Sequence, residues 1–250
     1  MKKIFILLAI GLLFSFEGNA RESWEYKIQA GYNIGGSSPL PLPAEIRTIE
    51  KYSPDVFAPH LAVEATRWLN AQWGISAQIA LDNKGFTVCD QVKNLYTEIK
   101  IDGNPDPQTG NFTGKNTTKV RNGYFTVPIT VSYRTADRWL TQLGIYTAYL
   151  YHPHFSGTAS DGYIRRGNPT GEKIDVPHAS FDFSSEQNRF DYGLTLAEEW
   201  KFSKSFALRG QINWGLRSLF PSDFTGMSFN IYNIYGMLGV SYLLVLPARK

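Results

Sequence analysis

The sequence predicts an all-β protein, an eight-stranded antiparallel up-and-down transmembrane β-barrel with short periplasmic turns and long extracellular loops. Three observations predict this fold. Segments of about ten residues alternate between apolar and polar side chains, short and long connections between them alternate strictly, and tryptophan gathers beside the short connections. Successive side chains of a strand point to opposite faces, and a tilted strand crosses a bilayer with roughly 9–11 residues.

The composition fits a barrel better than a helical membrane protein. Aromatic residues make up 14% of the chain and charged residues 19%, and charged or strongly polar residues interrupt every apolar run after the N-terminus. Strands that carry one polar face produce this mixture, whereas a spanning helix needs about 20 mostly apolar residues. The formal net charge of +3 is too small to indicate a nucleic-acid partner.

Residues 1–20 have the features of a cleaved signal peptide. The basic pair Lys2-Lys3 precedes an apolar run from Ile4 to Phe16, and small residues follow it. We therefore expect the mature chain to begin at Arg21, residues 21–250 to form one outer-membrane barrel domain, and the protein to reside in the cell outer membrane of a Gram-negative envelope.

The first predicted strand is residues 24–35, which alternate without a break from Trp24 to Gly35. Residues 36–57 are a predicted loop. Three prolines hold its first part extended, and Ala44 to Tyr52 could form one or two helical turns, with Ile46 and Ile49 on one side.

The next two predicted strands are residues 59–68 and 73–82, joined by a tight turn at 69–72. Residues 84–122 then form a long polar connection rich in Gly, Asn, Asp and Thr. Residues 96–101 alternate weakly, so strands could extend beyond the membrane at that point.

The clearest hairpin is residues 124–134 and 139–151 around the polar turn 135–138. In its first strand Val131 faces lipid and Ser132 faces the lumen. Pro128 lies mid-strand and has no N–H to donate, which predicts a bulge or a local break in the ladder. The remaining elements are a loop at 152–187, a strand at 188–202, a turn at 203–205, a strand at 206–217, a loop at 218–229 and a strand at 230–246.

Aromatic residues predict two girdles at the membrane interfaces, where amphipathic rings are favoured. One girdle lies at the end of the short turns and comprises Trp24, Trp68, Trp73, Trp139 and Trp200, with Trp214 as an exception. The other lies at the opposite end and comprises Tyr32, Tyr149, Tyr151, Phe190 and Tyr192.

The polar faces place charges of both signs inside the barrel. The inward set is Glu25, Lys27, Glu64, Asp82, Arg134, Arg189, Asp191, Glu199, Arg209 and Arg217. An eight-stranded barrel is just wide enough for side chains to fill, and an unpaired charge there would be costly. The size favours a structural network that plugs the lumen over the alternative, a selective pore.

Catalytic and ligand-binding patterns are weak in this chain. His152 and His154 share a face at the end of a strand, but no third metal ligand is evident. Ser156, Ser160 and Asp161 follow closely, which leaves a lipid-modifying Ser/His/Asp site as a remote alternative. Cys89, the only cysteine, lies in a predicted loop. We predict no catalytic residue, no cofactor and no metal site, and therefore no enzyme.

Five short pieces, spread in order over most of the mature chain, resemble the PorT-like outer-membrane β-barrel proteins, a broad "porin family" group of Gram-negative envelopes. The pieces are Gly35-Gly36 with Pro39-Leu-Pro-Leu-Pro43, the stretch Tyr124 to Ile129, Gly144 to Leu150, Asp191-Tyr-Gly-Leu194 and Gly239-Val-Ser-Tyr242. The resemblance implies an eight-stranded outer-membrane barrel. It carries no activity, although PorT itself is associated with protein secretion, and it offers no catalytic residues to transfer. Met237 departs from the polar residue usual in a C-terminal insertion signal.

The leading hypothesis is an integral outer-membrane barrel with a side-chain-filled lumen and a structural or surface-interaction role. The second is a transport or secretion component, either a narrow pore or a PorT-like accessory. The expected partners are the lipid bilayer, the outer-membrane insertion machinery during assembly, and a protein that contacts the extracellular loops.

Overall fold

The computed structural model describes residues 23–103 and 106–244 and confirms an all-β, antiparallel fold. The predicted count of eight strands is wrong for this part of the chain, which forms eleven. They are β1 Ser23–Pro39, β2 Ile46–Pro54, β3 Pro59–Trp68, β4 Trp73–Ile101, β5 Gln108–Ala136, β6 Trp139–His152, β7 Phe155–Arg166, β8 Lys173–Asp182, β9 Phe190–Lys201, β10 Phe206–Ser218 and β11 Ile231–Leu244. The predicted signal peptide and the last predicted strand residues, 245 and 246, lie outside the described residues. No helix in the described ranges is long and apolar enough to cross a membrane.

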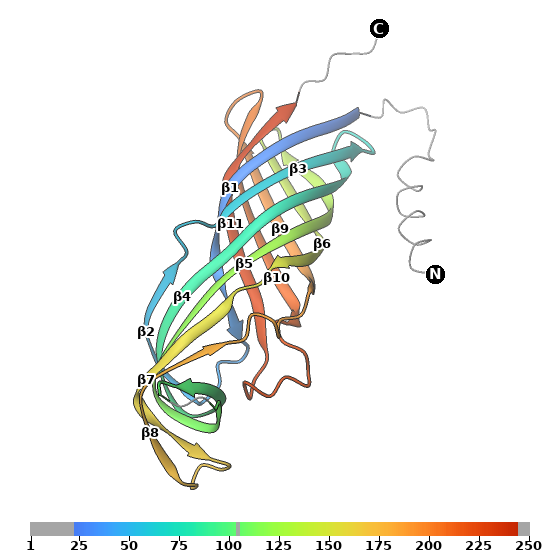
Figure 1. The fold of residues 1–250 in the computed structure, drawn as a ribbon. Helices are drawn as coiled ribbons and strands as arrows, with labels where there is room; N and C mark the ends of the chain where they lie inside the picture. The colour runs from blue at the N-terminus through green and yellow to red at the C-terminus, as the bar shows by residue number, and fades with distance from the viewer. Residues whose placement is uncertain (1–22, 104–105, 245–250) are drawn as a thin grey trace.

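The sheet curls back on itself to form a barrel (Figure 1). Its strands pair in the order β4-β3-β1-β11-β10-β9-β6-β5, and β5 pairs again with β4. Every pairing is antiparallel. Each strand predicted from sequence contributes to one strand of this ring. The start of β1 and the end of β11 lie at one end, which we call the proximal end, and the opposite part is the distal half (Figure 1).

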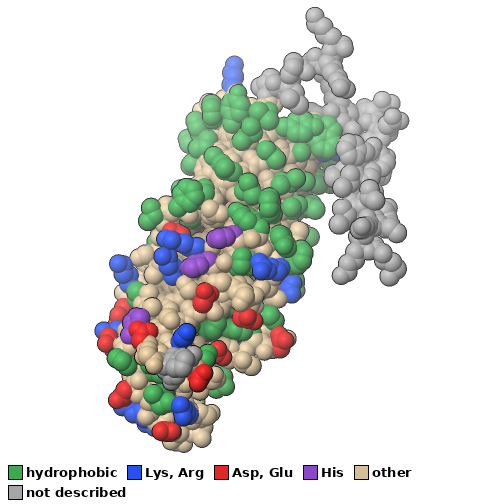
Figure 2. Space-filling view, viewed as in Figure 1, with side chains coloured by type: hydrophobic (Ala, Val, Ile, Leu, Met, Phe, Trp, Pro, Cys, Tyr) green, Lys and Arg blue, Asp and Glu red, His purple; other side chains and the backbone are tan. Residues whose placement is uncertain are grey.

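The ring turns apolar side chains outward and polar side chains inward, as the alternation predicted. In β9, side chains alternate between exposed and buried from Phe190 to Trp200. In β5, Val131 is 50% exposed while Ser132 is fully buried. Figure 2 shows the result, a surface of hydrophobic side chains over the proximal part of the molecule and charged side chains over the distal part. Alternating strands around a polar interior produce such a belt.

Pro128 interrupts one ladder without shifting it. On the β6 side it pairs with Tyr146 in unbroken register. On the β4 side the pairs Ala77–Ile129 and Ala80–Thr126 keep one register, but the two positions between them are unpaired. The predicted local break is therefore present and the bulge is not, because the missing N–H removes ladder bonds without adding a residue.

The prediction of a long polar loop at residues 84–122 is wrong. Strands β4 and β5 continue through it as a two-stranded ribbon from Lys84–Asn122 to Ile99–Gln108, so the connection between them is only residues 102–107. The weak alternation seen at residues 96–101 belongs to this extension. Threonine-rich stretches such as residues 117–118 suit strands as well as loops.

Two other predicted loops also contain strands. Residues 44–52 form no helical turns, because β2 pairs antiparallel with the extended part of β4. The region 152–187 contains β7 and β8, which pair with each other, and β7 also pairs with β5. The predicted loop at 218–229 is confirmed, since this segment connects β10 and β11 without a further strand. Its Met227 forms an isolated antiparallel bridge with Thr97 of β4.

The distal strands form a second, smaller ring. The pairings run from β4 to β5, β7 and β8, and β8 returns to the end of β4 at Lys100 and Ile101. Its interior is an apolar cluster of Val92, Leu95, Ile99, Ile101, Phe112, Ala159, Ile164, Val176 and Ala179. The pairing of β4 with β5 shifts register between Val92 and Leu95, where Asn94 adopts a positive φ of 57°. Even-numbered residues of β4 point inward before this shift and odd-numbered residues after it.

Candidate functional site

A network of buried ions crosses the proximal half of the lumen. Arg209 on β10 donates from Nη1 to Glu199 Oε1 at 2.8 Å, and Lys27 on β1 donates to the other oxygen of Glu199 at 2.7 Å. Glu64 on β3 completes the group at 3.5 Å from Arg209 and 3.7 Å from Lys27. These four side chains come from four strands and are at most 4% exposed, so the network joins opposite walls of the barrel.

Neutral side chains fill the remaining positions of this layer. The amide of Gln142 accepts from Arg209 at 2.6 Å and donates to Glu64 at 3.1 Å. It also donates to the hydroxyls of Ser76 and Ser132, which contact each other at 2.6 Å. Buried ions persist only when paired and hydrogen-bonded, and this layer supplies both conditions.

A second lumen layer lies towards the distal side and is built on tyrosines. Lys84 Nζ lies 5.0 Å from the ring centre of Tyr124 and 5.5 Å from those of Tyr146 and Tyr235, and it has no hydrogen-bond partner among the described residues. The ring faces attract the ammonium group electrostatically. Two acids flank this layer. Asp82 contacts His60 Nδ1 at 2.7 Å, and Asp191 accepts from the Tyr146 hydroxyl at 3.0 Å.

The inward charges predicted from sequence are brought together in part. Six are buried in the lumen: Lys27, Glu64, Asp82, Asp191, Glu199 and Arg209. Glu25 lies beside them, 3.3 Å from Lys27. Arg134 is 35% exposed at the proximal rim, Arg217 is half-buried and Arg189 is exposed, so these three do not belong to the filled lumen.

Sequence reasoning missed Lys84, the central cation of the second layer. The alternation that places Asp82 inside would place Lys84 inside as well, had the strand been extended by two residues. The prediction that Trp68 belongs to the aromatic girdle facing the membrane is also wrong. Trp68 is 3% exposed, donates to Glu25 at 3.2 Å and lies under the Arg134 guanidinium, because it follows Glu64 by four residues and so lies on the same inward face of β3. Trp24, Trp73, Trp139, Trp200 and Trp214 are exposed.

The residues considered for catalysis are engaged elsewhere. His154 contacts Ser156 at 3.2 Å, while Asp161 pairs with Lys115 at 3.0 Å. Ser160 lies opposite His178 in the β7–β8 ladder, and His178 pairs with Asp102. Among the described residues, no group of three or more His, Cys, Asp or Glu side chains is arranged to hold a metal ion.

Cys89 does not lie in a loop. It sits within β4 opposite Lys51 of β2 and Thr117 of β5, and its side chain is half-buried. The Thr117 hydroxyl donates to its sulfur at 3.6 Å. The placement between two strands limits access of reagents to this thiol.

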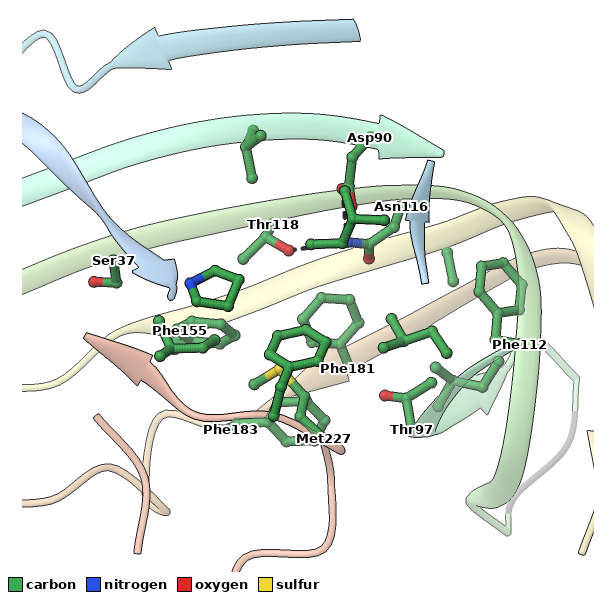
Figure 3. A pocket seen from close by; sticks show the side chains of 18 of the residues that line it. Ser37, Asp90, Thr97, Phe112, Asn116, Thr118, Phe155, Phe181, Phe183 and Met227 are labelled. Carbon is green, nitrogen blue, oxygen red and sulfur yellow. Dashed lines mark hydrogen bonds between the residues drawn. The ribbon is translucent and has the colours of Figure 1, made fainter. Parts of the chain in front are cut away.

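An apolar cavity lies between the barrel mouth and the small distal ring (Figure 3). Its volume accessible to water-sized molecules is about 90 Å³. Phenylalanine rings form much of the wall, contributed by Phe86, Phe112, Phe155, Phe181, Phe183 and Phe229. Asp90, Asn116 and Thr118 gather at one side of it, and Met227 closes it from the 218–229 loop (Figure 3).

A family model described as "Outer membrane protein beta-barrel domain" matches residues 16–221. The chain is similar to a solved structure of Ail, the attachment invasion locus protein of Yersinia pestis, which was determined in complex with the heparin analogue sucrose octasulfate. The two sequences are 10% identical, the match covers 90% of this chain and 100% of that chain, and the TM-score is 0.40. It is also similar to the outer membrane protein OprG from Pseudomonas aeruginosa, with 9% identity, 90% and 98% covered, and a TM-score of 0.39. No curated protein matches the chain.

Proposed function

The chain belongs to the outer membrane protein β-barrel domain family, and from this premise we propose that it is a non-enzymatic barrel with a closed lumen and a surface-interaction role. In this proposal the eight-strand ring spans the bilayer. The distal half, with β2, β7 and β8, stands outside the cell as a folded platform for a protein partner.

The filled lumen is the observation that carries this proposal. Arg209, Glu199 and Lys27 form a continuous bonded chain across the barrel, with none of them more than 3% exposed. An ion that crossed this layer would have to displace charge-assisted hydrogen bonds in a low-dielectric interior, at a cost of several kcal/mol. A steady conductance is therefore not expected.

The proposed orientation follows from the position of the chain ends. Both Ser23 and Leu244, the first and last described residues, lie at the proximal end. A chain delivered by a signal peptide at residues 1–20 is released on the periplasmic side, and an even number of spanning strands returns its C-terminus there. The turns near residues 69–72, 135–138 and 203–205 would then be periplasmic, and the distal half extracellular.

Single-channel recording in planar bilayers tests the closed lumen. The refolded wild-type protein should give no stepwise conductance. The matched variant replaces both partners of the central pair, Glu199→Ala with Arg209→Ala, so that neither is left buried without the other, and Lys27 keeps Glu25 at 3.3 Å and Glu64 at 3.7 Å as ion partners. This variant should conduct in steps. A wild-type protein that conducts in uniform steps, under conditions where heat-modifiable mobility shows it is folded, would contradict the proposal and favour the narrow pore.

The absence of an enzymatic role is part of this proposal. It is supported by the placement of Asp161, whose carboxylate pairs with Lys115 instead of a histidine. Purified protein incubated with outer-membrane lipid should leave the lipid unchanged by mass spectrometry. Deacylated or acyl-transferred lipid that requires His154 would overturn it.

A PorT-like role in secretion is the second candidate. Its support is the ordered set of short sequence resemblances, and the folded distal platform would supply the contact surface. Crosslinking in intact cells with a photoreactive residue at exposed positions on β7 and β8 would separate the two roles. Recovery of inner-membrane or periplasmic secretion proteins would favour this candidate, whereas recovery of surface partners alone would favour the first.

A further inference from the structure

The distal cavity combines an apolar body with one polar side, and this combination resembles a ligand site. Its wall is assembled from β1, β2, β4, β5, β7, β8, the 218–229 loop and the start of β11. The rings of Phe155, Phe181 and Phe183 turn towards the same space (Figure 3). Phe155 and Phe183 lie 6.3 Å apart between ring centroids, and Phe181 and Phe183 lie 5.2 Å apart. Binding sites for small molecules have mostly apolar walls with a few convergent polar groups.

The polar side of the cavity offers hydrogen-bond acceptors. The Asn116 amide donates to Asp90 Oδ1 at 2.9 Å and to Thr118 Oγ1 at 3.1 Å. An Asn amide has two N–H donors, so these bonds use both of them. The oxygens of Asp90 and Asn116 then remain as the complementary groups for a ligand, and a ligand that donates hydrogen bonds suits them.

Among the described residues that line the cavity, Asp90 is the only charged one. The residue is 5% exposed. Within the described residues no Lys or Arg side chain forms an ion pair with it, and the neighbouring charge is another carboxylate, Glu50 on β2. Burial and Glu50 together raise the pKa of Asp90 to about 6, against the opposing effect of its hydrogen bond from Asn116. At neutral pH a buried carboxylate of this kind is stabilised by an external cation.

We propose that the distal cavity binds a small amphiphilic amine, with its alkyl chain among the phenylalanine rings and its ammonium group on Asp90 and Asn116. The volume of about 90 Å³ limits the ligand to one short chain. A cavity on the order of 150 Å³ is known to hold benzene, so a bulky ring system would not fit without opening the wall. The site is separate from the filled lumen and does not depend on conductance.

Methyl NMR of the folded protein in lipid nanodiscs can detect such binding at one atom. Apart from Met1, the chain has two methionines, Met227 and Met237. Met227 lines the cavity, whereas Met237 is buried in the barrel wall on β11 and does not line it. With ¹³C-methyl methionine, n-butylamine, which has fewer heavy atoms than benzene, should shift the Met227 signal saturably and leave Met237 unmoved. The neutral analogue 1-butanol should need about ten times the concentration, and butanoate should have no effect.

Two variants separate the polar side from the apolar body. Asp90→Asn keeps the shape and should lose the preference for the amine over the alcohol, while 1-butanol still shifts Met227. Asp161→Asn is the matched control, since that acid pairs with Lys115 and does not line the cavity. It should keep the wild-type preference.

Filling the cavity provides the second arm. Ala159→Phe places a ring into the space from β7 and should abolish the Met227 shift for every ligand. If that variant does not fold, Ser37→Leu fills the cavity from β1 instead. The proposal is overturned if no ligand shifts Met227 saturably in folded wild-type protein, if 1-butanol and n-butylamine bind equally, or if a folded filling variant binds as tightly as wild type.

Discussion

Arg209 is the central cation of the buried ion network in the proximal half of the lumen. It bonds to Glu199, Gln142 and Gln211 and is 2% exposed. Arg209→Met should lower the free energy of unfolding by about 3–5 kcal/mol, because Glu199 would keep only Lys27 as a buried partner. Urea titration in lipid vesicles, read by tryptophan fluorescence, measures this loss.

The matched control is a rim arginine. Arg134 is 35% exposed and lies 3.4 Å from Glu25. Arg134→Met should cost less than about 1 kcal/mol, as expected for a solvated ion pair. Equal losses for the two arginines would mean that the lumen is hydrated and that the network does not plug it.

Lipid contact is testable at a single outward residue. Val131 is 50% exposed on the belt, and Ile49 on β2 is 52% exposed in the distal half. Val131→Arg should destabilise the barrel by about 2–4 kcal/mol if it lies near the bilayer midplane. Ile49→Arg, with the same exposure but in water, should change stability by less than about 0.5 kcal/mol. A neutral Val131→Arg would place β5 outside the bilayer or reverse its facing.

At the scale of elements, the spanning strands were predictable and the distal ones were not. Each spanning strand repeats one inward and one outward set, because lipid and lumen impose a strict period of two. Beyond Asp82 this rule changes. Inward residues are Phe86 and Val92 before Asn94 but Leu95 and Ile99 after it, so the bulge breaks the pattern that sequence reasoning follows.

The β4–β5 ribbon makes a direct prediction about hydrogen exchange. Residues 86–92 and 112–120 are paired with β2, β7 and each other, so their amides should exchange over hours. The amide of Gly103, in the connection between the two strands, should exchange within seconds. Mass spectrometry of deuterated peptides resolves both ranges. Rapid exchange across 84–122 would restore the long loop expected from the sequence.

At the scale of the whole molecule, the alternation of short and long connections predicted the barrel but not its distal platform. The length of a connection indicates at which end of the barrel it lies. It does not indicate whether a long connection is an irregular loop or contains strands. The candidate lumen site followed from the inward charges, of which Lys27, Glu199 and Arg209 proved to be the core. The distal cavity could not be predicted, because it depends on residues such as Phe155 and Met227 that meet only when separate connections pack together.

In the proposed orientation, the belt lies in the outer membrane and the distal platform lies outside the cell. Two exposed positions test it, Glu172 in the β7–β8 turn and Lys204 in the β9–β10 turn, each replaced by cysteine in a Cys89→Ser background. A membrane-impermeant maleimide added to intact cells should label Glu172→Cys and should label Lys204→Cys only after the outer membrane is permeabilised. The reverse pattern, or labelling of neither position until the cells are lysed, would contradict the account.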